Sequence, residues 1–167
     1  MTFEEYAFAR TQALIRLARL LCGDEHRAED LVQDVLAKAY VRWGRIARMD
    51  QPDLYVRRML VNANHAWWKR RSSRDISVAV VADKPGVVDA AAEVDERDAL
   101  WGVVRALPPR QRTVIVLRYY EDLDDATIAA ILDCSTGTVR THAKRALDAL
   151  RERRSPSATS LGARSVL

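Results

Sequence analysis

The residues after Ser135 carry side chains whose types and spacing suit contacts with DNA bases. At about 100° per residue in a helix, an apolar stripe separates from an opposite face rich in Thr, Arg and Lys. Arg and Lys can bond guanine edges or phosphates, and Thr can contact a base or a thymine methyl. The alternative is a pair of packed helices with a solvated basic face. The candidate DNA-contacting residues are Ser135, Thr136, Thr138, Arg140, Thr141, Lys144 and Arg145.

A second basic segment lies in the first half of the chain. From Arg57 to Arg74 there are six Lys or Arg residues and no acidic residue. A basic face with an outward Trp and an amide suits a nucleic-acid backbone with unstacked bases. The alternative is a solvated cationic helix in which Trp67 and Trp68 both belong to the core. The candidate contacts on the outward side are Arg57, Arg58, Asn62, His65, Trp68 and Lys69, whereas Trp67 is expected in the core with Val56, Met59, Leu60 and Ala63.

A third set of residues is acidic and polar: Glu29, Asp30, Gln33 and Asp34 share one side of a predicted helix. An acidic strip would repel DNA, so it is better suited to docking on a basic protein. An ordinary solvated helix face is the alternative.

Several kinds of chemistry lack the residues they need. Cys22 and Cys134 form no CxxC pair, and the three His residues are scattered. No catalytic cluster or Gly-rich phosphate loop is present, so we expect no catalytic residue, no metal and no cofactor. Charges interrupt every apolar stretch, which argues against a signal peptide or membrane span and favours a cytoplasmic protein. The net charge of +4 is small, so the placement of charge matters more than its sum.

The basic helix that contains Trp67 and Trp68 needs a scaffold, and the sequence of the first half predicts three helices. Thr2 and Glu5 form a capping-box pattern, and that helix should end at Gly23. Asp24 should cap a second helix that ends at Gly44, with Tyr40 in its apolar stripe. Asp50 should cap a third helix that begins at Pro52 and runs to about Arg71. The connection 44–51 should lie against the start of this helix and wall a pocket for a base.

The second half predicts four short helices, over about 93–106, 109–120, 125–132 and 136–153. The last two are joined by Asp133-Cys134-Ser135, which is the spacing of a helix-turn-helix. We therefore expect an all-α protein with two small helical domains on a flexible linker. The predicted ranges are 1–72 and 93–154 for the domains, 73–92 for the linker and 155–167 for a disordered tail.

Together these segments resemble the extracytoplasmic-function (group IV) branch of the sigma-70 family. Ala28–Asp34 resembles its region 2 segment for docking on the clamp helices of the polymerase largest subunit, and Pro52–Arg71 resembles the segment that melts and reads the minus-ten element. Asn62 stands where the family has a promoter-contacting Asn. The region 4 pattern, which reads the minus-thirty-five element, is matched by Leu107–Arg112, Leu117–Leu123, Gly137–Arg140 and Arg145-Ala146.

The resemblance covers about residues 10–153, with two departures. Tyr55-Val56 replaces a common Trp-Leu, and Trp67-Trp68 replaces less aromatic residues. The tandem Trp and the Arg57-Arg58 pair are similar to a sigma-E-like subfamily. The resemblance implies a non-enzymatic initiation factor for a specific regulon, with core RNA polymerase (clamp helices and flap) and promoter DNA as partners and an anti-sigma factor as a further candidate.

Two other functions compete with this interpretation. A stand-alone helix-turn-helix regulator would explain residues 109–153 but would leave the acidic strip and the basic Trp helix without a role. An enzyme acting on nucleic acid would need a dispersed site, because no clustered catalytic set is present.

Overall fold

The computed structural model describes residues 1–74 and 96–154, which are helical and contain no strand. The predicted tail and nearly all of the predicted linker lie outside these residues. None of the helices in the described ranges is long and apolar enough to cross a membrane. The elements are α1 (Phe3–Cys22), α2 (Glu25–Val41), α3 (Trp43–Ile46), α4 (Pro52–Arg74), α5 (Glu96–Arg105), α6 (Pro109–Ile115), the π-helical η1 (Val116–Tyr120), α7 (Asp125–Leu132) and α8 (Thr136–Arg154).

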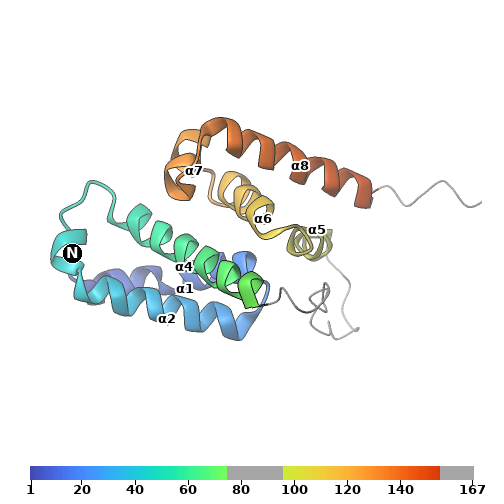
Figure 1. Cartoon of the computed structure of the whole chain (residues 1–167). Coiled ribbons are helices and arrows are strands. Elements are labelled where there is room, and N and C mark those ends of the chain that lie inside the picture. The colour runs from blue at the N-terminus through green and yellow to red at the C-terminus, as the bar shows by residue number, and fades with distance from the viewer. Residues whose placement is uncertain (75–95, 155–167) are drawn as a thin grey trace, which may run out of the picture.

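The first half is a bundle of α1, α2 and α4, and its helix ends follow the predicted signals (Figure 1). Thr2 Oγ1 accepts from the Glu5 amide at 3.2 Å, and Glu5 Oε2 accepts from the Thr2 amide at 2.8 Å. Gly23 ends α1 with φ 74°, a left-handed conformation that costs Gly little. The Asp24 carboxylate then caps α2 by accepting from the Arg27 amide at 3.0 Å.

The connection between α2 and α4 differs from the prediction. The second helix ends at Val41 rather than Gly44, and Trp43–Ile46 form the short helix α3. Trp43 explains the change, because its Nε1 donates to the Met1 carbonyl at 3.1 Å and its ring lies 4.8 Å from the Tyr6 ring. Tyr40, predicted in the buried stripe, is 60% exposed.

The start and end of α4 also differ from the prediction. Gln51, not Asp50, directly precedes the helix, and its carbonyl accepts from the Tyr55 amide at 3.2 Å. The helix continues to Arg74, past the predicted end at Arg71. Val61 and Asn64, which lie outside the predicted core set of this helix, are both buried. The buried side of α4 is therefore wider than the sequence pattern indicated.

The second half contains the predicted helix-turn-helix, α7 and α8, joined by residues 133–135. Asp124 caps α7 by accepting from the Thr127 amide at 2.7 Å, and Ser135 caps α8 by accepting from the Thr138 amide at 3.1 Å. The predicted single helix over 109–120 is instead α6 followed by η1, where the Glu121 amide bonds the Val116 carbonyl. Such π-helical turns are rare and often mark functional sites.

The two halves pack against each other, with α4 beside α6 and α7 (Figure 1). Arg112 of α6 is 5% exposed and donates to the Leu21 carbonyl at 3.1 Å and to the Leu107 carbonyl at 3.2 Å. One side chain from the second half thus bonds the end of α1 in the first half. This packing decides which residues of α4 face solvent.

Candidate nucleic-acid and polymerase interfaces

The helix α8 has the two faces that the sequence predicts. Val139, Ala143 and Ala146 are buried, whereas the opposite side is exposed. The exposed candidate contacts on α8 are Arg140, Thr141, Lys144 and Arg145. The first turns of the second helix in a helix-turn-helix are the part that reaches base edges, so this face is free to do so in the described structure.

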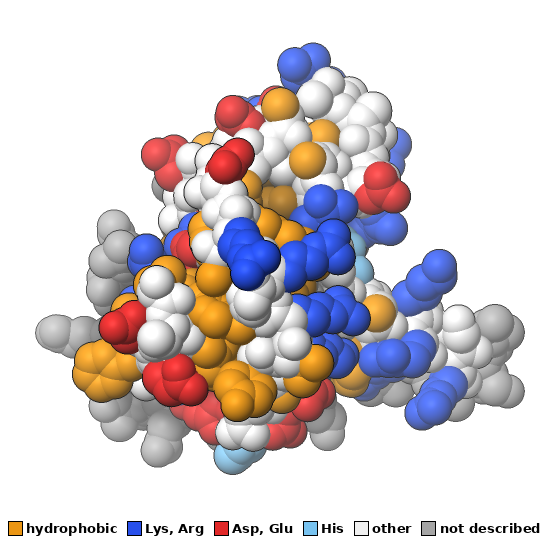
Figure 2. Space-filling view, turned by 90° about the vertical axis from the view of Figure 1, so that its left-hand side faces the viewer, with side chains coloured by type: hydrophobic (Ala, Val, Ile, Leu, Met, Phe, Trp, Pro, Cys, Tyr) orange, Lys and Arg blue, Asp and Glu red, His pale blue; other side chains and the backbone are white. Residues whose placement is uncertain are grey.

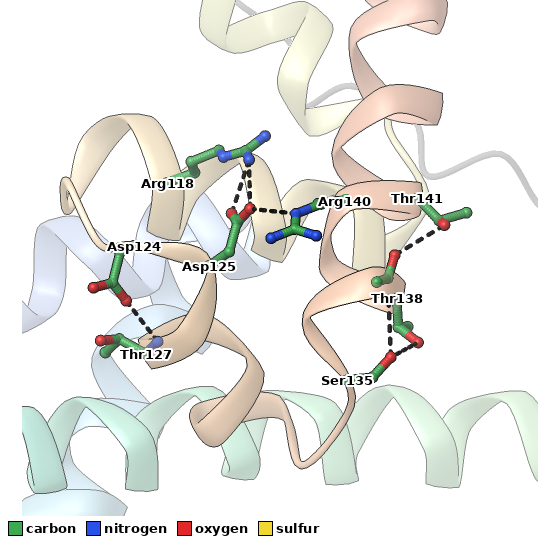
Figure 3. Close-up of polar contacts among 9 residues, drawn as sticks. Arg118, Asp124, Asp125, Thr127, Ser135, Thr138, Arg140 and Thr141 are labelled. Atoms are coloured by element: carbon green, nitrogen blue, oxygen red, sulfur yellow. Dashed lines mark hydrogen bonds and ion pairs between the residues drawn. The ribbon is translucent and has the colours of Figure 1, made fainter.

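The hydroxyl groups near the start of α8 already have partners within the protein (Figure 3). Ser135 Oγ lies 2.9 Å from Thr138 Oγ1 as well as capping the helix, and Thr141 Oγ1 donates to the Gly137 carbonyl at 3.0 Å. Thr136 and Thr138 are half-buried. A threonine hydroxyl that donates its only hydrogen can still accept a hydrogen bond, so Thr141 remains a possible acceptor for a base amino group.

Arg140 joins a charged group that spans the helix-turn-helix. Its Nε lies 3.4 Å from Oδ2 of Asp125, the first residue of α7. Arg118 of η1 places Nη2 2.8 Å from the same oxygen (Figure 3). Arg140 is predictable from the sequence, whereas Asp125 and Arg118 are not, because their pairing depends on how η1, α7 and α8 pack.

The six candidate residues on α4 fall into two groups according to their exposure to solvent. Arg58, Asn62 and Lys69 are exposed, as predicted. The other three were predicted on the outward side but face the second half of the chain. Arg57, His65 and Trp68 are half-buried there, so their predicted exposure is wrong for this arrangement.

Each of these three residues meets a neighbour in the packed structure. Arg57 forms ion pairs with Asp53 at 2.9 Å and with Glu121 of the second half. His65 Nε2 lies 3.2 Å from Thr113 Oγ1. The Arg112 guanidinium lies 5.7 Å from the centre of the Trp68 ring.

Trp67 is not a simple core residue either, because it is only half-buried. The guanidinium of Arg27 lies 3.3 Å from the centre of its ring, a cation–π contact. Arg27 Nη2 also donates to Asn64 Oδ1 at 2.6 Å, and the Cys22 thiol lies 3.4 Å from the same oxygen. This buried polar group ties α1, α2 and α4 together, and the sequence pattern gave no sign of it.

A pocket of about 510 Å³ lies beside α3 and the start of α4. Its lining residues are Val41, Arg42, Gly44, Arg45, Ile46 and Tyr55. The predicted proximity of the 44–51 connection to the start of the third helix is therefore correct. The lining combines an aromatic ring with two arginines, which suits a planar base joined to a phosphate.

The acidic strip lies on α2. Asp30, Gln33 and Asp34 are exposed, while Glu29 is half-buried and lies 3.8 Å from Arg19. Figure 2 shows Lys and Arg side chains in a band across the middle and right of one face, with acidic side chains along its lower edge and others in its upper part.

Comparisons with known proteins agree with this geometry. The family models for sigma-70 region 2 and sigma-70 region 4 match residues 9–74 and 97–150. The RNA polymerase sigma-E factor of Streptomyces coelicolor is 38% identical over 152 residues, covering 91% of this chain and 85% of that protein. The chain belongs to the sigma-70 family. The sigma-E factor of Streptomyces avermitilis is also 38% identical, over 91% of this chain and 84% of its own.

A solved sigma factor has the same fold as this sigma-70 family member. The sigma factor RpoE of Bartonella quintana, crystallised with the anti-sigma factor NepR, matches with a TM-score of 0.67 and 25% identity. The match covers 90% of this chain and 94% of that one. The sigma-E relatives, together with further relatives named as ECF sigma factors, confirm the predicted placement in the extracytoplasmic-function branch, near sigma-E. Promoter recognition and transcription initiation are the function of this sigma factor.

Region 2 of the sigma factor corresponds to α1–α4 and region 4 to α5–α8. The functional residues that the sequence does not predict are mostly those that join or stiffen these regions. Arg112 and Glu121 lie inside segments that match the region 4 pattern. Nothing in the sequence indicated that they are buried between the two regions. Of these residues, only Arg42 and Arg45 have a signal in the sequence. They lie on either side of Gly44, which begins the connection predicted to wall the pocket.

Proposed function

We propose that this sigma factor divides promoter reading between α8, which reads the upstream element in duplex DNA, and α4, which captures the melted minus-ten element. The observation that carries this proposal is the exposed face of α8, where four DNA-suited residues lie opposite a buried apolar stripe. Arg140 and Thr141 would contact bases, and Lys144 and Arg145 would hold phosphates.

The minus-ten strand would follow the exposed side of α4. Arg58 and Lys69 would contact phosphates, and Asn62 would bond the edge of an unstacked base. The pocket with Tyr55, Arg42 and Arg45 would take a flipped base, because an aromatic ring can stack on any base. Arg57, His65 and Trp68 would join these contacts only after the two regions separate.

The acidic face of α2 would dock on core polymerase. Asp30, Gln33 and Asp34 are exposed and have no apolar cover, so they suit a basic helical surface such as the clamp helices. Region 4 would contact the flap. The protein itself would perform no chemistry and would act in the cytoplasm. An anti-sigma factor is a further proposed partner, since the similar RpoE was crystallised with NepR.

Run-off transcription with reconstituted core polymerase on a promoter library tests this proposal. The expected result is initiation at promoters that share an upstream and a minus-ten element at a fixed spacing. If the protein bound specific DNA but never associated with core polymerase, it would be a stand-alone regulator instead. Cleavage of the template with magnesium and without polymerase would indicate an enzyme.

A further inference from the structure

The carboxylate of Asp125 lies between two guanidinium groups, one from each neighbouring element (Figure 3). Arg118 Nη2 is 2.8 Å from both carboxylate oxygens, and Arg140 Nε is 3.4 Å from Oδ2. The side chain of Asp125 is 18% exposed, whereas that of Arg140 is 67% exposed. A largely enclosed carboxylate therefore contacts the inner edge of an exposed arginine.

Asp125 is the fixed partner in this group. It is the first residue of α7 and directly follows the capping residue Asp124, so the helix dipole favours a negative charge there. Arg118 Nη2 hydrogen-bonds Oδ2 and lies within ion-pair distance of Oδ1, which restrains the carboxylate. Of the two arginines, Arg140 is the one whose side chain extends into solvent.

The contact leaves the outer edge of Arg140 available. Within the described residues, no hydrogen bond or ion pair involves its two Nη atoms (Figure 3). These atoms form the edge that bonds guanine O6 and N7 in the major groove. An arginine whose Nε lies within ion-pair distance of a carboxylate has fewer conformations to lose when it binds, so the contact favours one geometry before the DNA arrives.

We propose that Asp125 is a positioning residue that sets the base preference of Arg140, and that the base read is a guanine of the upstream element. Arg118 supplies the balancing positive charge, so the carboxylate does not repel the DNA. The group carries two positive charges and one negative charge. This inference rests on the proposed base-reading role of Arg140 and adds the residue that orients it.

The test uses holoenzyme made from core polymerase and the full chain, on promoters with a randomised upstream element. Binding is scored at each position for the parent, Asp125→Asn, Arg140→Ala and the double variant. Asp125→Asn keeps the shape of the side chain but removes its charge. The matched control is Asp148→Asn, which removes an exposed carboxylate from α8 that pairs with Arg151 at 3.7 Å and not with Arg140. Thermal unfolding of each variant reports on the fold.

We expect Asp125→Asn to reduce the preference for guanine at one position by about fivefold or more, within the range that a bidentate contact provides. Arg140→Ala should reduce the preference at the same position, and Asp125→Asn should add nothing to it in the double variant. The control should leave the preference profile unchanged.

Two results would overturn the inference and are distinguishable from failure of the base-reading role. If Arg140→Ala alters one position while Asp125→Asn alters none, or changes binding equally for all sequences, Asp125 does not position Arg140. If Arg140→Ala itself leaves every position unchanged, the proposed base reading fails first. If Asp125→Asn unfolds the domain, Asp125→Ser serves instead, and an unchanged profile with this uncharged side chain would also count against positioning.

Discussion

Arg57 of α4 and Glu121, the residue after η1, form an ion pair that joins region 2 to region 4. Glu121 is almost enclosed, with 10% of its side chain exposed, and Arg57 also pairs with Asp53 at 2.9 Å. Burial raises the pKa of Glu121, while the nearby Arg57 guanidinium acts in the opposite direction. A residue proposed to contact the promoter is thus held by the other DNA-reading region.

Glu121→Gln should loosen the contact between the two regions. Removing one partner of a charge-assisted contact typically costs about 1.5–3 kcal/mol. We expect about 1–2 kcal/mol here, because Arg57 keeps its pair with Asp53. Fluorescence energy transfer between labels on Lys38→Cys and Arg153→Cys measures the separation. Cys134→Ser avoids a third label, and the other free cysteine, Cys22, is buried.

The control for this variant is Glu152→Gln, which removes an exposed carboxylate from α8. The transfer efficiency should fall for Glu121→Gln and stay constant for the control. An unchanged efficiency in both would mean that this ion pair does not hold the regions together.

Acid should destabilise the packed arrangement through His65. Thr113 Oγ1 donates to the Pro109 carbonyl at 2.8 Å, so it is available to accept from His65 Nε2–H. Burial, and then the nearby Arg110, lower the pKa of His65 to about 4. The stability associated with the neutral ring is complete above its ordinary pKa of about 6.5 and is lost as pH falls from there toward about 4.

Urea unfolding at several pH values measures this effect. The free energy of unfolding should fall by less than about 1.4 kcal/mol per pH unit below pH about 6.5, and His65→Gln should flatten the profile. Burial also lowers the pKa of His142, so protonation of His142 likewise reduces stability as pH falls. Burial raises the pKa of Glu121, so protonation of Glu121 has the opposite effect on stability. The exposed His26 gives the matched control, His26→Gln. A slope that survives His65→Gln would assign the effect to another group.

Local signals predicted much of the fold, whereas contacts between the regions were not predictable. The Thr2 capping box, the Gly23 end and the Ser135 cap depend on residues a few positions apart, so the sequence contains all their parts. The partners of Arg57 and His65 lie in region 4, and helical periodicity says nothing about contacts at that sequence separation. The exposed face of α8 was predictable because its stripe follows one helical period.

Trp67→Ala should destabilise region 2, though less than loss of a fully buried ring. A fully buried Trp costs about 3–5 kcal/mol when truncated to Ala. Trp67 is half-buried but also stacks on Arg27 at 3.3 Å, so we expect about 2–3 kcal/mol. Thermal or urea unfolding measures it. Trp67→Phe should recover most of the loss by keeping an aromatic face, and equal losses in both variants would argue against a cation–π contribution.

Charge reversal on α2, Asp30→Lys with Asp34→Lys, should weaken binding to core polymerase while leaving helicity intact. Both side chains are exposed, so the change removes charge complementarity without disturbing the core. Exposed charges mainly affect association rate and its salt dependence, so surface plasmon resonance at two salt concentrations is the informative measurement. Asp148→Lys with Glu152→Lys, two exposed residues of α8, makes the same change in total charge and serves as the control. Native helicity with parent-like association would remove the acidic face from the docking surface.

Asn62→Ala should impair the sigma factor mainly when the promoter must be opened. Asn62 is exposed on α4, so its loss should leave stability and polymerase binding unchanged. Unpairing a base costs a few kcal/mol, and an amide that bonds the flipped base returns part of that cost. Transcription is compared on a duplex promoter and on one with a pre-melted minus-ten bubble. The bubble should restore the part of the activity lost to opening but not the part due to base identity.

Gln12→Ala removes an exposed amide from α1 and should behave like the parent. Parent-like activity of Asn62→Ala on both templates would exclude Asn62 from promoter opening and base recognition.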